Sequence, residues 1–84
     1  MNSGAGKTLE AIFANPINKT IPWQDVEALF MALGATVLEG SGSRVKFEIA
    51  NCSASFHRPH NPAITRIYQV RQARKFLTDI GVMP

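Results

Sequence analysis

The sequence contains a single cysteine, Cys52, among 84 residues. One thiol excludes an intrachain disulfide and a structural zinc site built on several thiolates. No apolar run approaches the roughly 20 residues that a membrane-spanning helix needs, and no charged and then apolar leader precedes a cleavage site. We therefore expect one small, soluble, cytoplasmic domain with no membrane partner.

Acidic residues are also few, six against nine lysines and arginines, which gives a net charge of +3. Asp and Glu are absent between His57 and Lys75, the segment that holds five of the nine basic residues. A basic segment of this kind is a candidate for binding the phosphates of a polyanion.

The first 20 residues predict a short helix with a tail and a connector. Residues 1–6 are small and are expected to be a flexible tail. Residues 7–14 carry Leu9, Ile12 and Phe13 at helical spacing, and Asn15-Pro16 ends that pattern because the residue before proline avoids the helical region. Residues 7–20 are therefore interpreted as an N-terminal helix and connector, and residues 21–84 as the main domain.

Two further helices are predicted in the main domain. The first begins at Pro22, which suits the first turn of a helix, and ends at Gly34. The second runs roughly from Tyr68 to Ile80 and ends at Gly81. Their apolar stripes are Val26, Leu29, Phe30 and Leu33 in the first, and Val70, Ala73, Leu77 and Ile80 in the second.

Three strands are predicted between these helices, at residues 35–39, 44–49 and 52–57. A Gly-Ser turn at residues 40–43 separates the first two, and Ala50-Asn51 separates the last two. Strict alternation of apolar and polar residues predicts an antiparallel hairpin with one buried face. The expected fold class is α+β, with an α-β-β-β-α order, an additional N-terminal helix, and a three-stranded antiparallel sheet that has its helices on one face.

The alternation also predicts the register of the hairpin. A two-residue turn at Ala50-Asn51 pairs Ile49 with Cys52 and sets Arg44 opposite His57. A slip of one residue would move His57 to the apolar face, which its polarity opposes. One open face is then expected to carry Arg44, Lys46, Ser53, Ser55 and His57.

His57 and His60 are the only histidines, and both lie at the end of the third strand or just after it. Imidazole titrates near neutral pH, so it is the usual group for moving a proton to or from a ribose hydroxyl or a leaving oxygen. The alternative is that both are exposed loop histidines with hydrogen bonds to the backbone. No metal site is expected, because two histidines without a nearby carboxylate leave a coordination shell short.

Arg71, Arg74 and Lys75 are spaced at i, i+3 and i+4 and form a basic ridge on the last predicted helix. Such a ridge is either a solvated helix face or a surface for phosphate contact, and both interpretations stay open.

The order of these segments resembles the HicA toxins of bacterial toxin–antitoxin systems. Four stretches carry the resemblance, within residues 21–82. They are the helix Pro22–Leu33 closed by Gly34, the stretch Gly42-Ser-Arg-Val-Lys-Phe47, the loop Phe56-His-Arg-Pro-His60, and the closing Ile80-Gly81-Val82.

This resemblance implies a double-stranded-RNA-binding-like fold and metal-independent cleavage of mRNA, without a small-molecule cofactor. It also implies neutralisation by a HicB-like antitoxin protein that covers the active surface. RNA contacts are then expected from Lys46, Arg58, His60, Arg71, Arg74 and Lys75.

One position departs from the family pattern, which has a catalytic histidine just after the Gly-Ser turn. Depending on the alignment, this chain has Arg44 or Ser43 there. Arginine stays protonated in proteins and a serine hydroxyl is a poor base, so neither replaces histidine unaided. The catalytic set is therefore expected to be His57 with Arg44 and Ser43; the alternative is a module that binds RNA or an antitoxin without cutting RNA.

Overall fold

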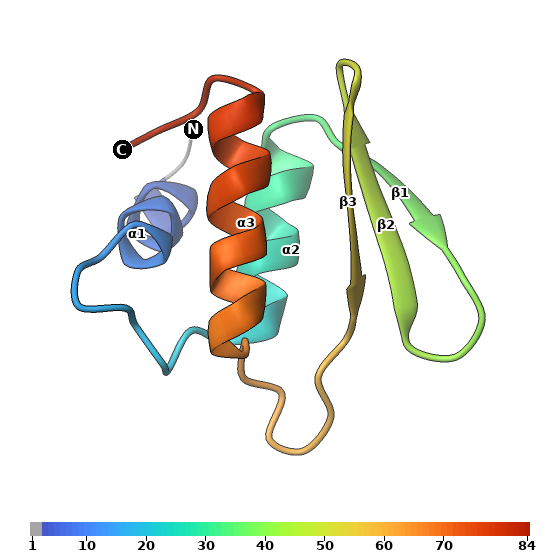
Figure 1. The fold of residues 1–84 in the computed structure, drawn as a ribbon, viewed down its shortest axis with the longest axis horizontal. Coiled ribbons are helices and arrows are strands. Elements are labelled where there is room, and N and C mark those ends of the chain that lie inside the picture. The colour runs from blue at the N-terminus through green and yellow to red at the C-terminus, as the bar shows by residue number, and fades with distance from the viewer. Residues whose placement is uncertain (1–2) are drawn as a thin grey trace.

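The computed structural model describes residues 3–84 and has the expected α+β class. Its elements follow in the order α1 (Ser3–Ile12), α2 (Trp23–Ala32), β1 (Thr36–Glu39), β2 (Arg44–Ile49), β3 (Cys52–His57) and α3 (Ile67–Asp79). The strands form one antiparallel sheet in the order β1-β2-β3. Figure 1 shows α2 and α3 on one side of this sheet, with α1 on the far side of the two helices.

The N-terminal helix α1 begins at Ser3, earlier than the predicted start at Lys7. The small residues of this segment therefore join the helix, and Ala5 is buried together with Leu9 and Ile12. The side-chain hydroxyl of Thr8 donates to the carbonyl of Gly4 at 3.1 Å. Of the predicted tail, residues 1–2 lie outside the described residues.

Helix α2 and its end agree with the apolar stripe and the glycine stop. Val26, Leu29 and Phe30 are buried, and the backbone of Gly34 has a φ of +90°, a conformation that glycine adopts without steric cost. The N–H of Gly34 donates to the carbonyl of Met31 at 3.0 Å, which closes the helix and directs the chain into β1.

The predicted hairpin register is confirmed. Ile49 pairs with Cys52, and Arg44 pairs with His57. Val45, Phe47 and Phe56 are buried beneath the helices, so the polar residues of the same strands face the other way. The fold class, the α-β-β-β-α order and the placement of the helices on one sheet face are therefore as expected.

The core centres on Phe30 of α2, which contacts aromatic rings from both the sheet and α3. Its ring centroid lies 4.9 Å from that of Phe47, 5.2 Å from that of Phe76 and 6.0 Å from that of Phe56. Edge-on and tilted pairs at these distances stabilise a core beyond the area that they bury. This cluster fixes the sheet against α2 and α3 and leaves the opposite face of the sheet uncovered by helices.

Candidate functional site

A hollow of about 430 Å³ lies on the sheet, along β1, β2 and the end of β3. Several residues of its lining are on the face that the helices leave open, as their alternation with buried Val45 and Phe56 requires. They are Leu38, Arg44, Lys46, Ser55 and His57. We call this feature the sheet hollow.

Arg44 and His57 are brought together by the way the strands pair. The N–H of Gly40 donates to the carbonyl of Arg44 at 2.9 Å, so the backbone of Arg44 faces β1. The N–H of Arg58 donates to the carbonyl of Ser43 at 2.9 Å. Arg44 and His57 therefore form a pair without mutual backbone hydrogen bonds, the arrangement in which facing Cα atoms lie about 4.5 Å apart and side chains are closest.

Gly40 also limits where Arg44 can lie. A Cβ atom at Gly40 would meet the Cβ of Arg44 at 3.0 Å. Because that approach is tighter than most Cβ contacts, a larger residue at this point of the turn would displace Arg44 by a few tenths of an ångström. The Gly-Ser turn therefore holds Arg44 close against the end of β1, at the rim of the sheet hollow.

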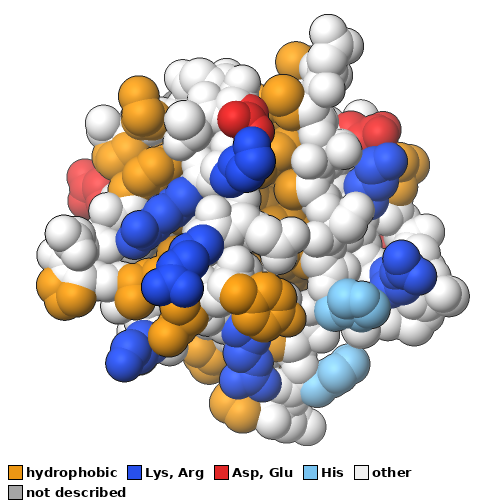
Figure 2. All heavy atoms as spheres, in the orientation of Figure 1, with side chains coloured by type: hydrophobic (Ala, Val, Ile, Leu, Met, Phe, Trp, Pro, Cys, Tyr) orange, Lys and Arg blue, Asp and Glu red, His pale blue; other side chains and the backbone are white. Residues whose placement is uncertain are grey.

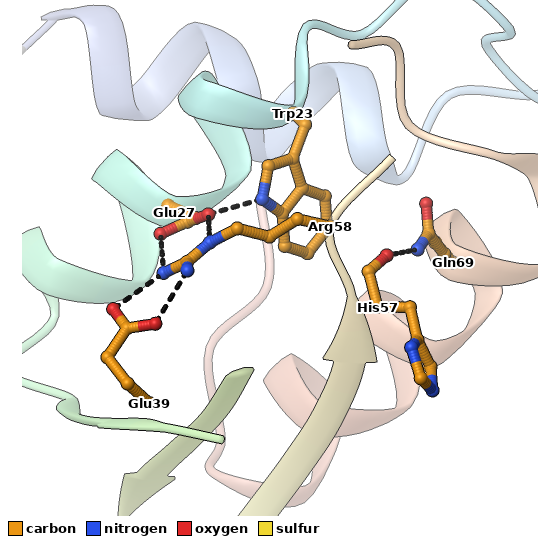
Figure 3. Close-up of polar contacts among 6 residues, drawn as sticks. All are labelled: Trp23, Glu27, Glu39, His57, Arg58 and Gln69. Atoms are coloured by element: carbon orange, nitrogen blue, oxygen red, sulfur yellow. Dashed lines mark hydrogen bonds and ion pairs between the residues drawn. The ribbon is translucent and has the colours of Figure 1, made fainter. Parts of the chain in front are cut away.

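The backbone of His57 is anchored by a buried glutamine of α3. The side-chain amide of Gln69 donates to the carbonyl of His57 at 2.7 Å, and its amide oxygen accepts from the N–H of Arg66 at 3.0 Å. Figure 3 shows the imidazole of His57 directed away from Glu27, Glu39 and Arg58. The ring is therefore presented on an exposed side chain from a fixed backbone position.

Arg58, which the sequence predicts as an RNA contact, forms ion pairs with two carboxylates of the same chain. Its Nε donates to Glu27 at 2.7 Å, and its two terminal nitrogens donate to Glu39 at 2.6 and 2.9 Å (Figure 3). The indole N–H of Trp23 donates to the same Glu27 carboxylate. The hydrogen bonds that Arg58 donates, first to Glu39 and then to Glu27, raise the pKa of Arg58 further above its usual range. Arg58 thus ties α2, the end of β1 and the loop after β3 together.

The remaining predicted residues of the sheet and loop occupy different positions. Ser43 is half-buried, outside the lining of the sheet hollow, and its carbonyl accepts from Arg58. The ammonium of Lys46 lies 3.4 Å from a carboxylate oxygen of Glu48. His60 is exposed in the loop, and Figure 2 shows both histidines on one face of the molecule, near lysine and arginine side chains.

The three residues of the basic ridge differ in what they contact. Arg74 donates from Nε to the carbonyl of Ile12 at 2.6 Å and from a terminal nitrogen to that of Ala14 at 2.7 Å. Lys75 is exposed and pairs with Asp79 at 3.0 Å. Arg71 is exposed beside a second hollow. The ridge is therefore not one uniform surface, because Arg74 is bound to the C-terminal end of α1.

That second hollow includes three residues that the sequence predictions did not select: Lys19, Arg66 and Tyr68. Arg66 and Tyr68 lie two positions apart in the basic segment between His57 and Lys75, so a cation close to an aromatic residue was a usable signal. Lys19 lies in the connector before α2, and only the tertiary fold brings it to the start of α3. A sequence pattern carries no signal for that approach.

No group of three or more His, Cys, Asp or Glu within residues 3–84 could hold a metal ion. Over the same residues, no helix is long and apolar enough to cross a membrane. Comparisons with protein-family models, curated proteins and solved structures found no match to the chain. The two hollows and the groups that line them are therefore the features of this chain that bear on its function.

Proposed function

We propose that the chain is a HicA-like toxin that acts in the cytoplasm, binds mRNA on its open sheet face and cleaves it as a metal-independent endoribonuclease. The observation that carries this proposal is the side-by-side position of Arg44 and His57 at the sheet hollow. A guanidinium and an imidazole, which can accept or donate a proton, then lie beside one cavity. A HicB-like antitoxin would inhibit the enzyme by covering this face.

The chemistry assigned to these residues is attack of a ribose 2′-oxygen on the adjacent phosphorus. His57 accepts the proton of the 2′-hydroxyl as the O2′–P bond forms and the P–O5′ bond breaks. A water protonates the departing 5′-oxygen, so the products are a 2′,3′-cyclic phosphate and a 5′-hydroxyl end. Arg44 and Lys46 stabilise the charge that develops on the phosphoryl oxygens. The backbone of Ser43, which accepts from Arg58, positions the start of β2 beside this centre.

A cleavage assay on a defined RNA in the presence of a chelator tests the proposal. We expect His57→Ala to lower the rate by about 10²–10⁴, the usual contribution of one general acid–base residue. Ser53→Ala is the matched control, because Ser53 is exposed on the same strand but outside the sheet hollow. Equal cleavage by the native chain and His57→Ala would remove His57 from the mechanism.

The alternative is a module of the same fold that binds RNA or docks on an antitoxin without cutting RNA. The presence of Arg44 where the HicA pattern has a histidine favours this candidate. It predicts salt-sensitive RNA binding, no cleavage and no growth arrest on induced expression. Growth and bulk mRNA decay after induction therefore distinguish the two functions, and a small adjacent antitoxin gene would favour the toxin.

A further inference from the structure

The second hollow has a volume of about 510 Å³ and lies at the N-terminal end of α3. Its lining includes the cations Lys19, Arg66 and Arg71 and the aromatic Tyr68, and no acidic residue. We call it the helix hollow. Lysine and arginine side chains gather over α3 and below it on the face shown in Figure 2.

The cations of the helix hollow are not neutralised within the part of the chain that the structure describes. The ion pairs there involve Lys46, Arg58 and Lys75, not Lys19, Arg66 or Arg71. Three unpaired cations around one concavity attract a polyanion, and binding releases counterions. Charge complementarity therefore favours a phosphate-bearing ligand.

The walls of the helix hollow are held by backbone pairing between two distant segments. The N–H of Thr65 donates to the carbonyl of Ile21 at 2.8 Å, and the N–H of Trp23 donates to that of Ala63 at 3.0 Å. Pro22 and Ile64 form an isolated antiparallel bridge between these bonds. The connector that carries Lys19 is thereby fixed beside the first turn of α3.

Two uncharged side chains indicate that the ligand carries groups other than phosphates. Tyr68 is 60% exposed at the helix hollow, so the face of its ring is accessible to a flat group of a ligand. Thr65 is 2% exposed, and its hydroxyl has no hydrogen-bond partner among residues 3–84. A buried hydroxyl without a partner is costly, and rotation of the Thr65 side chain toward the hollow that it lines would let a ligand oxygen satisfy it.

We propose that the helix hollow binds a single-stranded segment of RNA next to the segment held at the sheet hollow. Lys19, Arg66 and Arg71 contact its phosphates, and one base stacks on Tyr68, because every base offers a flat face to an aromatic ring. Gln69 links one lining residue of each hollow, because its side chain bonds to the backbone of both His57 and Arg66. This inference rests on the proposed RNA binding and extends the RNA path beyond the cleavage centre.

Tyr68 is the only tyrosine of the chain, so fluorotyrosine labelling gives one ¹⁹F NMR resonance that reports on the helix hollow. The titration uses the His57→Ala chain and a single-stranded oligoribonucleotide, so that the RNA stays intact. We expect the resonance to shift as RNA is added and to reach a limit when the chain is saturated with RNA. Tyr68→Ala should weaken binding roughly tenfold, as loss of one stacked base does, whereas Tyr68→Phe should keep the affinity.

The charge contribution is tested by Arg66→Ala combined with Arg71→Ala, with thermal melting as the check on folding. We expect weaker RNA binding and a salt dependence whose slope falls by about 1.4, that is about 0.7 for each lost single-strand phosphate contact. Lys7→Ala is the control, since Lys7 is an exposed cation of α1 that lies outside the hollow.

The outcomes separate this inference from the proposed function. Native affinity and salt slope in the double variant, with an unmoved Tyr68 resonance, would overturn the helix hollow while RNA binding by the chain stands. Displacement of RNA by an acidic peptide at equal charge concentration would also overturn it, because charge alone would then explain binding. A native chain that binds no RNA would contradict both proposals.

Discussion

The side-chain amide of Gln69 bonds to the carbonyl of His57 at 2.7 Å, and its oxygen bonds to the N–H of Arg66 at 3.0 Å. One side chain, 1% exposed, therefore joins the end of β3 to the first turn of α3. Gln69 and Gln72 together cover the outer edge of β3, because Gln72 also donates to a carbonyl of that strand, that of Ser55, at 3.0 Å. The sheet hollow and the helix hollow are fixed relative to each other by this contact.

Replacement of Gln69 by alanine is expected to lower the free energy of unfolding by roughly 2 kcal/mol, because it leaves a cavity and removes both bonds of a buried amide. Gln72→Ala is the matched control: it removes the same kind of bond at an exposed position and should cost about 0.5 kcal/mol. Urea unfolding measures both values. Equal losses in the two variants would show that Gln69 has no special part in holding β3 on α3.

The ion pair of Glu39 with Arg58 predicts a dependence of stability on pH. A hydrogen bond from Arg58 holds the pKa of the Glu39 carboxyl below its ordinary value of 4.5. Because the pKa is lower in the folded state, ionised Glu39 stabilises the fold above that value, and this contribution is lost as the pH falls through the lowered pKa.

Glu39→Gln is therefore expected to be less stable than the native chain near neutral pH and to approach it in acid. Urea unfolding from about pH 7 to about pH 3 measures the difference. Glu10→Gln, an exposed carboxylate of α1, is the control for a general charge effect. A difference between Glu39→Gln and the native chain that does not change across this range would contradict the assigned ion pair.

Arg74 is expected to contribute to stability through α1. Arg74→Lys keeps the positive charge but cannot reproduce the fork that bonds to the carbonyls of Ile12 and Ala14. We expect a loss of roughly 1.5–3 kcal/mol in the free energy of unfolding, with RNA affinity unchanged. Lys75→Ala, which removes an exposed i,i+4 pair with Asp79, should change stability by less than about 0.5 kcal/mol.

If Arg74→Lys instead bound RNA more weakly and kept the native free energy of unfolding, Arg74 would contact RNA directly, as the spacing of the basic ridge predicts.

The sheet and its register could be predicted from the sequence because its pattern is local. Val45 and Phe47 alternate with polar residues, and a shift of one position would bury His57, so a single register satisfies the burial of apolar groups. The same reasoning placed Arg44 opposite His57. Those predictions needed only neighbouring residues and a two-residue turn.

The contacts of the other basic residues could not be predicted, because they join segments far apart in the chain. Arg58 meets Glu27 of α2, and Arg74 meets the carbonyl of Ile12. Helical spacing shows which residues share a face, but it does not show which neighbouring element covers that face. Lys19 enters the helix hollow for the same reason, through the bridge between Pro22 and Ile64.

The turn between β2 and β3 carries backbone strain that one substitution should remove. Ala50 has a φ of 53°, in the left-handed region that costs a residue with a Cβ about 1 kcal/mol, whereas Asn51 does not have a positive φ. Positive φ at the first position alone is the pattern of a type II′ hairpin, which prefers glycine there. Ala50→Gly is therefore expected to raise the free energy of unfolding by about 0.5 kcal/mol, since relief of strain exceeds the added entropy of the unfolded chain.

Asn51→Gly adds that entropy without relieving strain, so it should lower the free energy of unfolding by a similar amount. Thermal melting of the two variants gives the sign of each effect, and a lower melting temperature for Ala50→Gly would show that the turn holds Ala50 without strain.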